Sequence, residues 1–168
     1  MSGYFGDPNY TGQVLSANGW LNTGDLAYLV GDSIFITGRE KDLIIINGRN
    51  IWPQDIEYLA ELQPEVRPAD ASAFSVPDPQ GEETAVLVIE CRESNLEKRA
   101  DLIRRVTALI REELGIDCFI ELVSRNTLPR TTSGKLSRSA ARKDFLERVA
   151  RGQTTHPGAM AELKLESG

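Results

Sequence analysis

The segment SNLEKRADLIRRVTALIREELGIDCFIELV, from Ser94 to Val123, decides the fold class of this chain. Ser94 and Glu97 have the spacing of a capping box, in which two side chains satisfy backbone N–H groups at the start of a helix. Residues suited to one helix face then recur until Gly115, a residue typical of helix ends: Leu96, Ala100, Ile103, Thr107, Ile110 and Leu114. Because the β-rich run CFIELV follows, the segment predicts a long amphipathic helix that leads into a strand.

Two further strands are predicted just before this helix. The runs ASAFSVP (71–77) and TAVLVIEC (84–91) are rich in β-branched and apolar residues. The turn-forming sequence DPQGEE (78–83) separates them. We therefore expect them to pair as antiparallel neighbours.

The part of the chain before residue 71 predicts a hairpin, a strand and a short helix. The runs LAYLV (26–30) and SIFITG (33–38) join across Gly31 and Asp32 as a hairpin. The sequence DLIIING from Asp42 predicts a third strand that ends at Gly48. A helix is expected to begin at Pro53 and to stop before Pro64, with acidic residues in its first turn and apolar residues on one face: Asp55 and Glu57, then Ile56, Leu59 and Ala60.

A last helix is predicted after Ser137, which is a suitable N-cap, with Ala141, Phe145 and Val149 on its apolar face. Runs of strands and helices in this order indicate an α+β fold. We expect a small mixed or antiparallel sheet flanked by helices and preceded by a β-hairpin. No internal repeat is present.

The charge of the chain is negative overall but uneven. The 168 residues carry a formal net charge of −6 and 40% hydrophobic residues, enough for one modest core. A nucleic acid is not an expected partner, because the chain lacks an overall excess of basic residues to neutralise phosphates. The segment 124–151 has eight basic residues and two acidic ones, a net charge of +6. This basic segment could meet an anionic partner.

The cysteines and the histidine give no metal-binding pattern. Cys91 and Cys118 lie in apolar runs without CxxC spacing, so we expect buried thiols. His156 lies in a tail rich in Thr, Pro and Gly, where we expect a solvated linker. No apolar run reaches the ~18 residues that a membrane span needs, and the N-terminus has no secretory signal pattern. A cytoplasmic location is the resulting expectation.

The loop LPRTTSGKLSRSAAR (128–142) places Lys135 on a Gly-, Thr- and Ser-rich stretch before the last helix. A phosphate-binding P-loop needs a glycine five residues before the Gly-Lys pair and a hydroxyl residue after it. Pro129 and Leu136 occupy those positions, which argues against a P-loop. A flexible basic loop on the surface, without a catalytic role, remains a possible interpretation of this stretch alone.

Three stretches in order resemble the C-terminal portion of the adenylate-forming superfamily, which includes acyl-CoA synthetases and acyl-AMP ligases. They are GWLNTGDLAYL (19–29), FITGREKDLIIINGRNIWPQDIE (35–57) and LPRTTSGKLSR (128–138). The part GRNIWPQDIE resembles fatty acyl-AMP ligases. The resemblance implies that residues 1–40 end a large adenylation domain, that residues 41–150 form a small C-terminal domain, and that residues 151–168 are a tail or linker. Residues 1–40 should then expose apolar side chains such as Leu26, Tyr28, Ile34 and Phe35.

The resemblance assigns two nucleotide contacts and a hinge. Asp25 matches the carboxylate that accepts hydrogen bonds from the ribose hydroxyls of ATP, a role that suits two charged oxygens. Arg39 matches a second nucleotide contact, where a forked cation can reach ribose or phosphate oxygens. Lys41 matches the hinge at which the small domain rotates against the large one. Gly48 and Arg49 lie on a turn that faces the acceptor thiol in similar enzymes.

Lys135 is the catalytic residue that the resemblance implies. In such enzymes this lysine reaches the carboxylate substrate and the α-phosphate of ATP, where an ammonium group offsets the repulsion between two anions. The implied reaction joins a fatty acid to ATP and Mg²⁺, which are bound mainly by the large domain, and forms acyl-AMP. The acyl group then passes to the phosphopantetheine thiol of an acyl carrier protein, or to coenzyme A. A non-catalytic module that docks carrier proteins through the basic segment is the alternative from another class.

Overall fold

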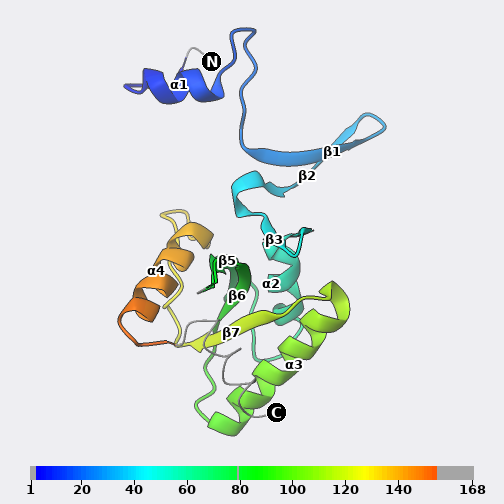
Figure 1. Ribbon diagram of the computed structural model, residues 1–168, viewed down its shortest axis with the longest axis vertical. Helices are drawn as coiled ribbons and strands as arrows, with labels where there is room; N and C mark the ends of the chain where they lie inside the picture. The colour runs from blue at the N-terminus through cyan, green and yellow to red at the C-terminus, as the bar shows by residue number, and fades with distance from the viewer. Residues whose placement is uncertain (1–2, 79, 155–168) are drawn as a thin grey trace. The chain divides into compact units, whose positions relative to one another are not determined.

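The computed structural model describes residues 3–78 and 80–154 and divides into two compact units with a boundary between Lys41 and Asp42 (Figure 1). His156 and most of the tail expected at 151–168 lie outside the described residues. Of the residues that are described, none forms a helix long and apolar enough to cross a membrane.

The first unit holds one helix and one hairpin. Its elements are α1 (Pro8–Val14), β1 (Asp25–Val30) and β2 (Ser33–Arg39), and the 3₁₀ helix η1 (Glu40–Asp42) follows at the boundary. The hairpin across Gly31 and Asp32 is confirmed, since Val30 pairs with Ser33. As expected, Tyr28, Ile34 and Phe35 are exposed, whereas Leu26 is half-buried.

Helix α1 was not predicted, although its signals are present in the sequence. Asp7 is the N-cap, and its side chain accepts a hydrogen bond from the Tyr10 N–H at 2.9 Å. Pro8 stands at the first helical position, where its missing donor costs nothing. A helix of seven residues without a buried side chain has too short an apolar pattern to be found by periodicity.

The second unit is built on a three-stranded sheet. Its elements are β3 (Ile44–Ile46), β4 (Arg49–Ile51), α2 (Pro53–Glu61), β5 (Ala71–Pro77), β6 (Glu83–Glu90), α3 (Leu96–Leu114), β7 (Cys118–Val123) and α4 (Arg138–Ala150). Strands β5 and β6 pair antiparallel, and β7 lies parallel to β6. This mixed sheet with flanking helices confirms the α+β prediction.

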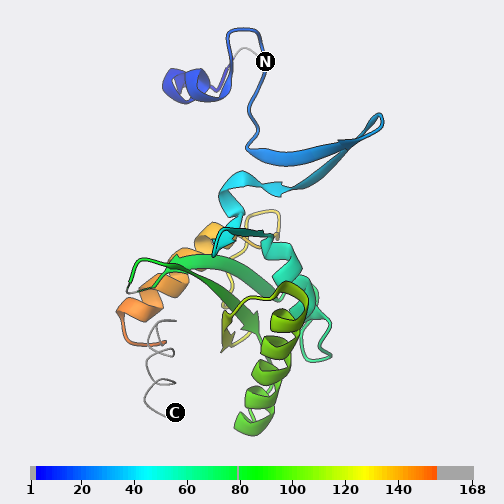
Figure 2. The same cartoon turned by 45° about the vertical axis from the view of Figure 1, so that its right-hand side comes forward.

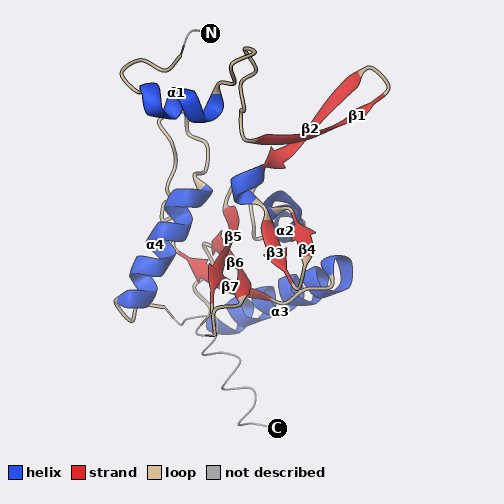
Figure 3. Ribbon diagram, turned by 45° about the horizontal axis from the view of Figure 1, so that its top comes forward, coloured by secondary structure: helices blue, strands red, loops and turns tan. Residues whose placement is uncertain are grey.

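Helices cover both faces of the sheet (Figures 2 and 3). One face packs against α2 and α3, with Ala73, Leu87 and Ile89 in the same buried cluster as Ile56 and Val106. The other face packs against α4. A second buried cluster there includes Phe74, Val76, Val86 and Val88 of the sheet and Phe145 of α4. Because both faces are covered, β6 reads as a continuous apolar run instead of an alternating one.

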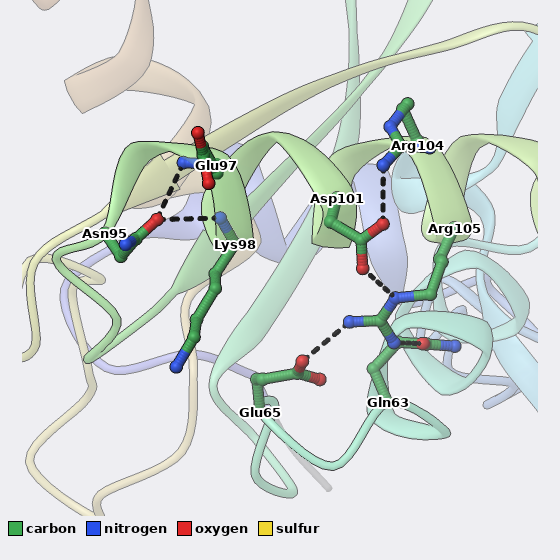
Figure 4. A network of polar contacts seen from close by, with 8 residues as sticks. All are labelled: Gln63, Glu65, Asn95, Glu97, Lys98, Asp101, Arg104 and Arg105. Carbon is green, nitrogen blue, oxygen red and sulfur yellow. Dashed lines mark hydrogen bonds and ion pairs between the residues drawn. The ribbon is translucent and has the colours of Figure 1, made fainter.

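Helix α3 begins one residue later than the capping box predicts. Asn95 is the N-cap, and its side chain accepts hydrogen bonds from the N–H groups of Glu97 and Lys98 (Figure 4). Asparagine is at least as good an N-cap as serine, so the preceding Ser94 was the wrong choice. Further along α3, Arg105 contacts Asp101 on the same helix and Gln63 and Glu65 after α2. These polar contacts hold α3 against the end of α2.

The strand predicted to end at Gly48 is instead the first half of a hairpin. Asn47 and Gly48 both have positive φ, 51° and 73°, which suits a two-residue turn of the primed type. Ile46 pairs with Arg49 across this turn, and β4 returns beside β3. Strand β4 was not predicted because its three residues are too few to show a clear alternation of apolar and polar side chains.

Both cysteines are free thiols, as expected, but they differ in exposure. Cys91 is buried, whereas Cys118 is half-buried and packs against the core formed with α2 and α3. Burial is the main cause that raises the pKa of the Cys118 thiol far above its ordinary value, and the charge of Asp117 adds to it. The thiol is therefore a poor nucleophile at neutral pH.

Candidate functional site

The first unit brings Asp25 and Arg39 together at the open end of its hairpin. The two residues are cross-strand partners, and Arg39 Nε lies 3.3 Å from Asp25 Oδ1. A β-bulge between Leu26 and Ala27 shifts the register by one residue. Without this bulge Asp25 would face Gly38. The bulge therefore creates the pair of side chains that the sequence assigns to the nucleotide.

A pocket of about 210 Å³ lies beside this pair in the first unit. Its lining comes from α1, from the segment before β1 and from the end of the hairpin: Tyr10, Val14, Asn22, Thr23, Gly24, Arg39, Glu40 and Lys41. An aromatic ring, a forked cation and nearby hydroxyl and amide groups could contact a ribose and its attached phosphate. The arrangement is suited to part of a nucleotide site.

Lys135 lies on a tight turn that is closed by its own backbone. The Thr131 N–H donates to the Lys135 carbonyl at 2.8 Å, and the Gly134 N–H donates to the Thr131 carbonyl at 2.8 Å. Gly134 has a φ of 80°, a conformation that other residues adopt only with strain. The side chain of Lys135 is exposed, and no residue that the structure describes forms an ion pair or hydrogen bond with its ammonium group. The turn presents a free positive charge.

The segment that leads into this turn is anchored at the ends of two strands of the sheet. Before the turn, the buried carboxylate of Glu90 accepts a hydrogen bond from the Leu128 N–H at 2.8 Å. Arg130 then donates to the Ala69 carbonyl at 2.8 Å and lies 3.3 Å from Asp70. The loop segment that leads to Lys135 is thus tied to the ends of β5 and β6.

After the turn, Arg138 forms an ion-pair cluster that sequence reasoning missed. Its guanidinium donates two hydrogen bonds to Glu57 on α2, at 2.8 and 2.6 Å, and lies 3.6 Å from Asp42. The hydrogen bond to Glu57 is the main cause that raises the pKa of Arg138 above its ordinary value, and burial opposes it. Glu57 was predicted to lie in the first turn of α2, but only Asp55 does, and the Glu57 carboxylate also accepts from the Ala73 N–H at 2.9 Å. Its role is to join three segments.

Lys41 lines the pocket beside Arg39, whereas Gly48 and Arg49 belong to the second unit. Lys41 is the middle residue of η1 and the last residue of the first unit. Arg49 on β4 is exposed, and its guanidinium donates to the Gly115 carbonyl at 3.3 Å. A cation at this carbonyl suits the negative end of the α3 dipole. This contact gives Arg49 a structural role in addition to the acceptor-side role expected for it.

The described residues do not gather a set of magnesium ligands. No group of three or more His, Cys, Asp or Glu side chains is arranged to hold a metal ion in the part of the chain that the structure describes. The magnesium ion implied by ATP chemistry therefore does not fit a site built from the described residues.

Comparison with known proteins gives consistent matches along most of the chain, although no family model matches it. The chain is 37% identical over 155 residues to a long-chain-fatty-acid–AMP ligase of Mycobacterium tuberculosis, covering 82% of this chain and 26% of that protein. It is 38% identical over 133 residues to a medium-chain-fatty-acid–[acyl-carrier-protein] ligase of Moorena producens, covering 76% of this chain and 22% of that protein. The chain thus spans about a quarter of the length of these relatives.

A solved structure gives the same result in three dimensions. It comes from a study of fatty acyl-adenylate ligases of E. coli and L. pneumophila, and it matches with a TM-score of 0.78 at 47% identity. The match covers 90% of this chain and 27% of that one. The fold and the sequence are both similar to part of the adenylate-forming ligases, and the partial coverage of each relative is consistent with a C-terminal domain. This similarity to fatty acyl-AMP ligases and acyl-CoA synthetases confirms the resemblance seen in the sequence.

Proposed function

We propose that this chain is the C-terminal part of a fatty acyl-AMP ligase and that Lys135 acts in its first half-reaction. In that step a fatty acid carboxylate attacks the α-phosphorus of ATP, acyl-AMP forms, and pyrophosphate leaves. The observation that carries the proposal is the free ammonium group of Lys135 on an anchored turn. A positive charge that is unpaired among the described residues is available for the negative charge that builds up in the transition state.

Asp25 and Arg39 are proposed to bind the nucleotide. The Asp25 carboxylate would accept hydrogen bonds from the two ribose hydroxyls, and Arg39 would contact ribose or phosphate oxygens. Their 3.3 Å ion pair supports this assignment because it holds both side chains at the same end of the hairpin. Mg²⁺ and the acyl chain are proposed to bind to residues outside this chain.

Lys41 is proposed to be the hinge between two catalytic conformations. The boundary between the two compact units supports this role, because it falls directly after Lys41. In the first conformation the small domain presents Lys135, and in the second it presents the turn with Gly48 and Arg49 to the acceptor thiol. Such a rotation needs only a few residues to change their backbone torsions.

Replacing Lys41 with proline should separate the two half-reactions. Proline fixes φ near −65° and removes a backbone donor, so the backbone at residue 41 can no longer adopt both hinge conformations. We expect acyl-AMP formation and acyl transfer, measured separately on the full-length ligase, to fall by clearly different factors. Lys41→Ala is the matched control, since it keeps backbone freedom. Equal losses in both steps by a folded Lys41→Pro protein would contradict the hinge assignment.

An acyl carrier protein is the proposed acceptor. The net charge of +6 on residues 124–151 supports it, because carrier proteins are commonly acidic. The name of the Moorena producens relative specifies an acyl-carrier-protein ligase, which gives a second line of support.

The acceptor is tested by competition. The full-length ligase is supplied with fatty acid, Mg-ATP and equal concentrations of a carrier protein with its phosphopantetheine arm and of coenzyme A. We expect acylated carrier protein as the main thioester, and none with a carrier protein that lacks the arm. Acyl-CoA as the main product would favour the coenzyme A ligase. Carrier binding without any acyl-AMP formation would favour the non-catalytic docking module.

A further inference from the structure

The segment that carries Lys135 is joined to the start of the second unit by side chains far apart in sequence. Arg138 is the first residue of α4 and follows Lys135 by three positions. Its two hydrogen bonds to Glu57, at 2.8 and 2.6 Å, fix the guanidinium in a forked geometry. Nη1 also lies 3.6 Å from the carboxylate of Asp42. Asp42 directly follows Lys41.

The cluster is buried enough to hold a defined geometry. The side chains of Arg138, Asp42 and Glu57 are 29%, 20% and 13% exposed, so solvent screens their contacts less than it screens surface ion pairs. Glu57 also accepts from the Ala73 N–H at 2.9 Å, which connects the cluster to β5. Rotation of the backbone at Lys41 would therefore move Asp42, α2 and the start of α4 together.

We propose that Arg138 is a positioning residue for the adenylation step, because it fixes the Lys135 turn relative to the chain just after the hinge. This inference rests on the proposed function of Lys135. It adds one requirement to the proposed role of Lys135: after the hinge rotates, the ammonium group must lie at a defined position. An error of about 1 Å in the position of a catalytic group can cost about a hundredfold in rate.

The main test replaces Arg138 with glutamine in the full-length ligase. The amide removes the charge and the forked pair of donors, so the turn can shift away from its position. We expect kcat for acyl-AMP formation to fall about 10- to 100-fold while KM for ATP changes little. Transfer from supplied acyl-AMP to the acceptor should stay within about twofold, because that step does not use Lys135. Arg138→Lys keeps the charge and should recover part of the lost rate.

Arg142→Gln is the matched control on the same helix. Arg142 lies one turn further along α4, and its Nε donates to the Ser75 carbonyl at 2.8 Å, away from Asp42. This variant also loses a guanidinium and a tie to β5, but acyl-AMP formation should keep its wild-type rate. A second variant, Asp42→Asn, leaves the Glu57 pair intact. It should lower the adenylation rate by a smaller factor and add little to Arg138→Gln in the double variant.

The outcomes separate this inference from the proposed function. An inactive wild-type ligase would overturn the proposed function. An active wild type with Arg138→Gln as fast as Arg142→Gln would overturn the positioning role alone. Parallel loss of adenylation, transfer and thermal stability in Arg138→Gln would show a merely structural residue and would also overturn it. Loss confined to the adenylation kcat, with partial rescue by Arg138→Lys, would support the role.

Discussion

Replacing Lys135 with alanine should slow acyl-AMP formation by the full-length ligase roughly 10² to 10³-fold, the usual effect of removing one preorganised charged contact. The fatty acid carboxylate and the α-phosphate are both anions, and negative charge increases between them as the new bond forms. An ammonium group with three donors lowers the barrier at that point, and alanine offers no substitute. Pyrophosphate release in single-turnover experiments measures the effect. Lys143→Ala, a neutralised lysine on α4, is the control.

The same substitution should leave the fold and the second half-reaction intact. Lys135 is exposed and belongs to neither buried cluster, so its loss should change the free energy of unfolding by no more than about 0.5 kcal/mol. Transfer from supplied acyl-AMP should be nearly unchanged, because the small domain then presents another face. A fall of many degrees in the melting temperature, or collapse of transfer together with adenylation, would show that the lysine is structural.

The long elements of the second unit were predictable because their signals are local. Helix α3 has apolar residues at helical spacing and a left-handed glycine at its end, although its buried residues are Leu102, Val106 and Ile110 and the predicted face residue Leu96 is exposed. Strands β5 and β6 are separated by a turn with Asp78 and Gly81. The end of α2 before Pro64 and the Ser137 cap of α4 follow from single residues. Short elements were missed, since α1 and β4 have seven and three residues.

The arrangement of the candidate site was only partly predictable. Motif matching named Asp25 and Arg39 separately, but their pairing depends on a bulge beside Gly38. A glycine inside a strand can mark a bulge, but it does not specify which residues then pair. The cluster of Arg138 with Glu57 was missed because the two residues are 81 positions apart, and each is an ordinary charge on its own helix. Sequence patterns report neighbours along one element. Contacts between elements depend on packing, and only the folded chain shows them.

The central claim is that this chain supplies one essential charge to an active site completed by another domain. Fatty-acid-dependent exchange of labelled pyrophosphate into ATP tests it most directly, since exchange requires reversible formation of acyl-AMP. The measurement compares the full-length ligase with the isolated chain of 168 residues under identical conditions. We expect exchange by the full-length protein and only background by the isolated chain, because the proposed role of Lys135 supplies only one of the charges that the transition state needs. Clear exchange by the isolated chain, or none by a folded full-length protein with any fatty acid, would contradict the claim.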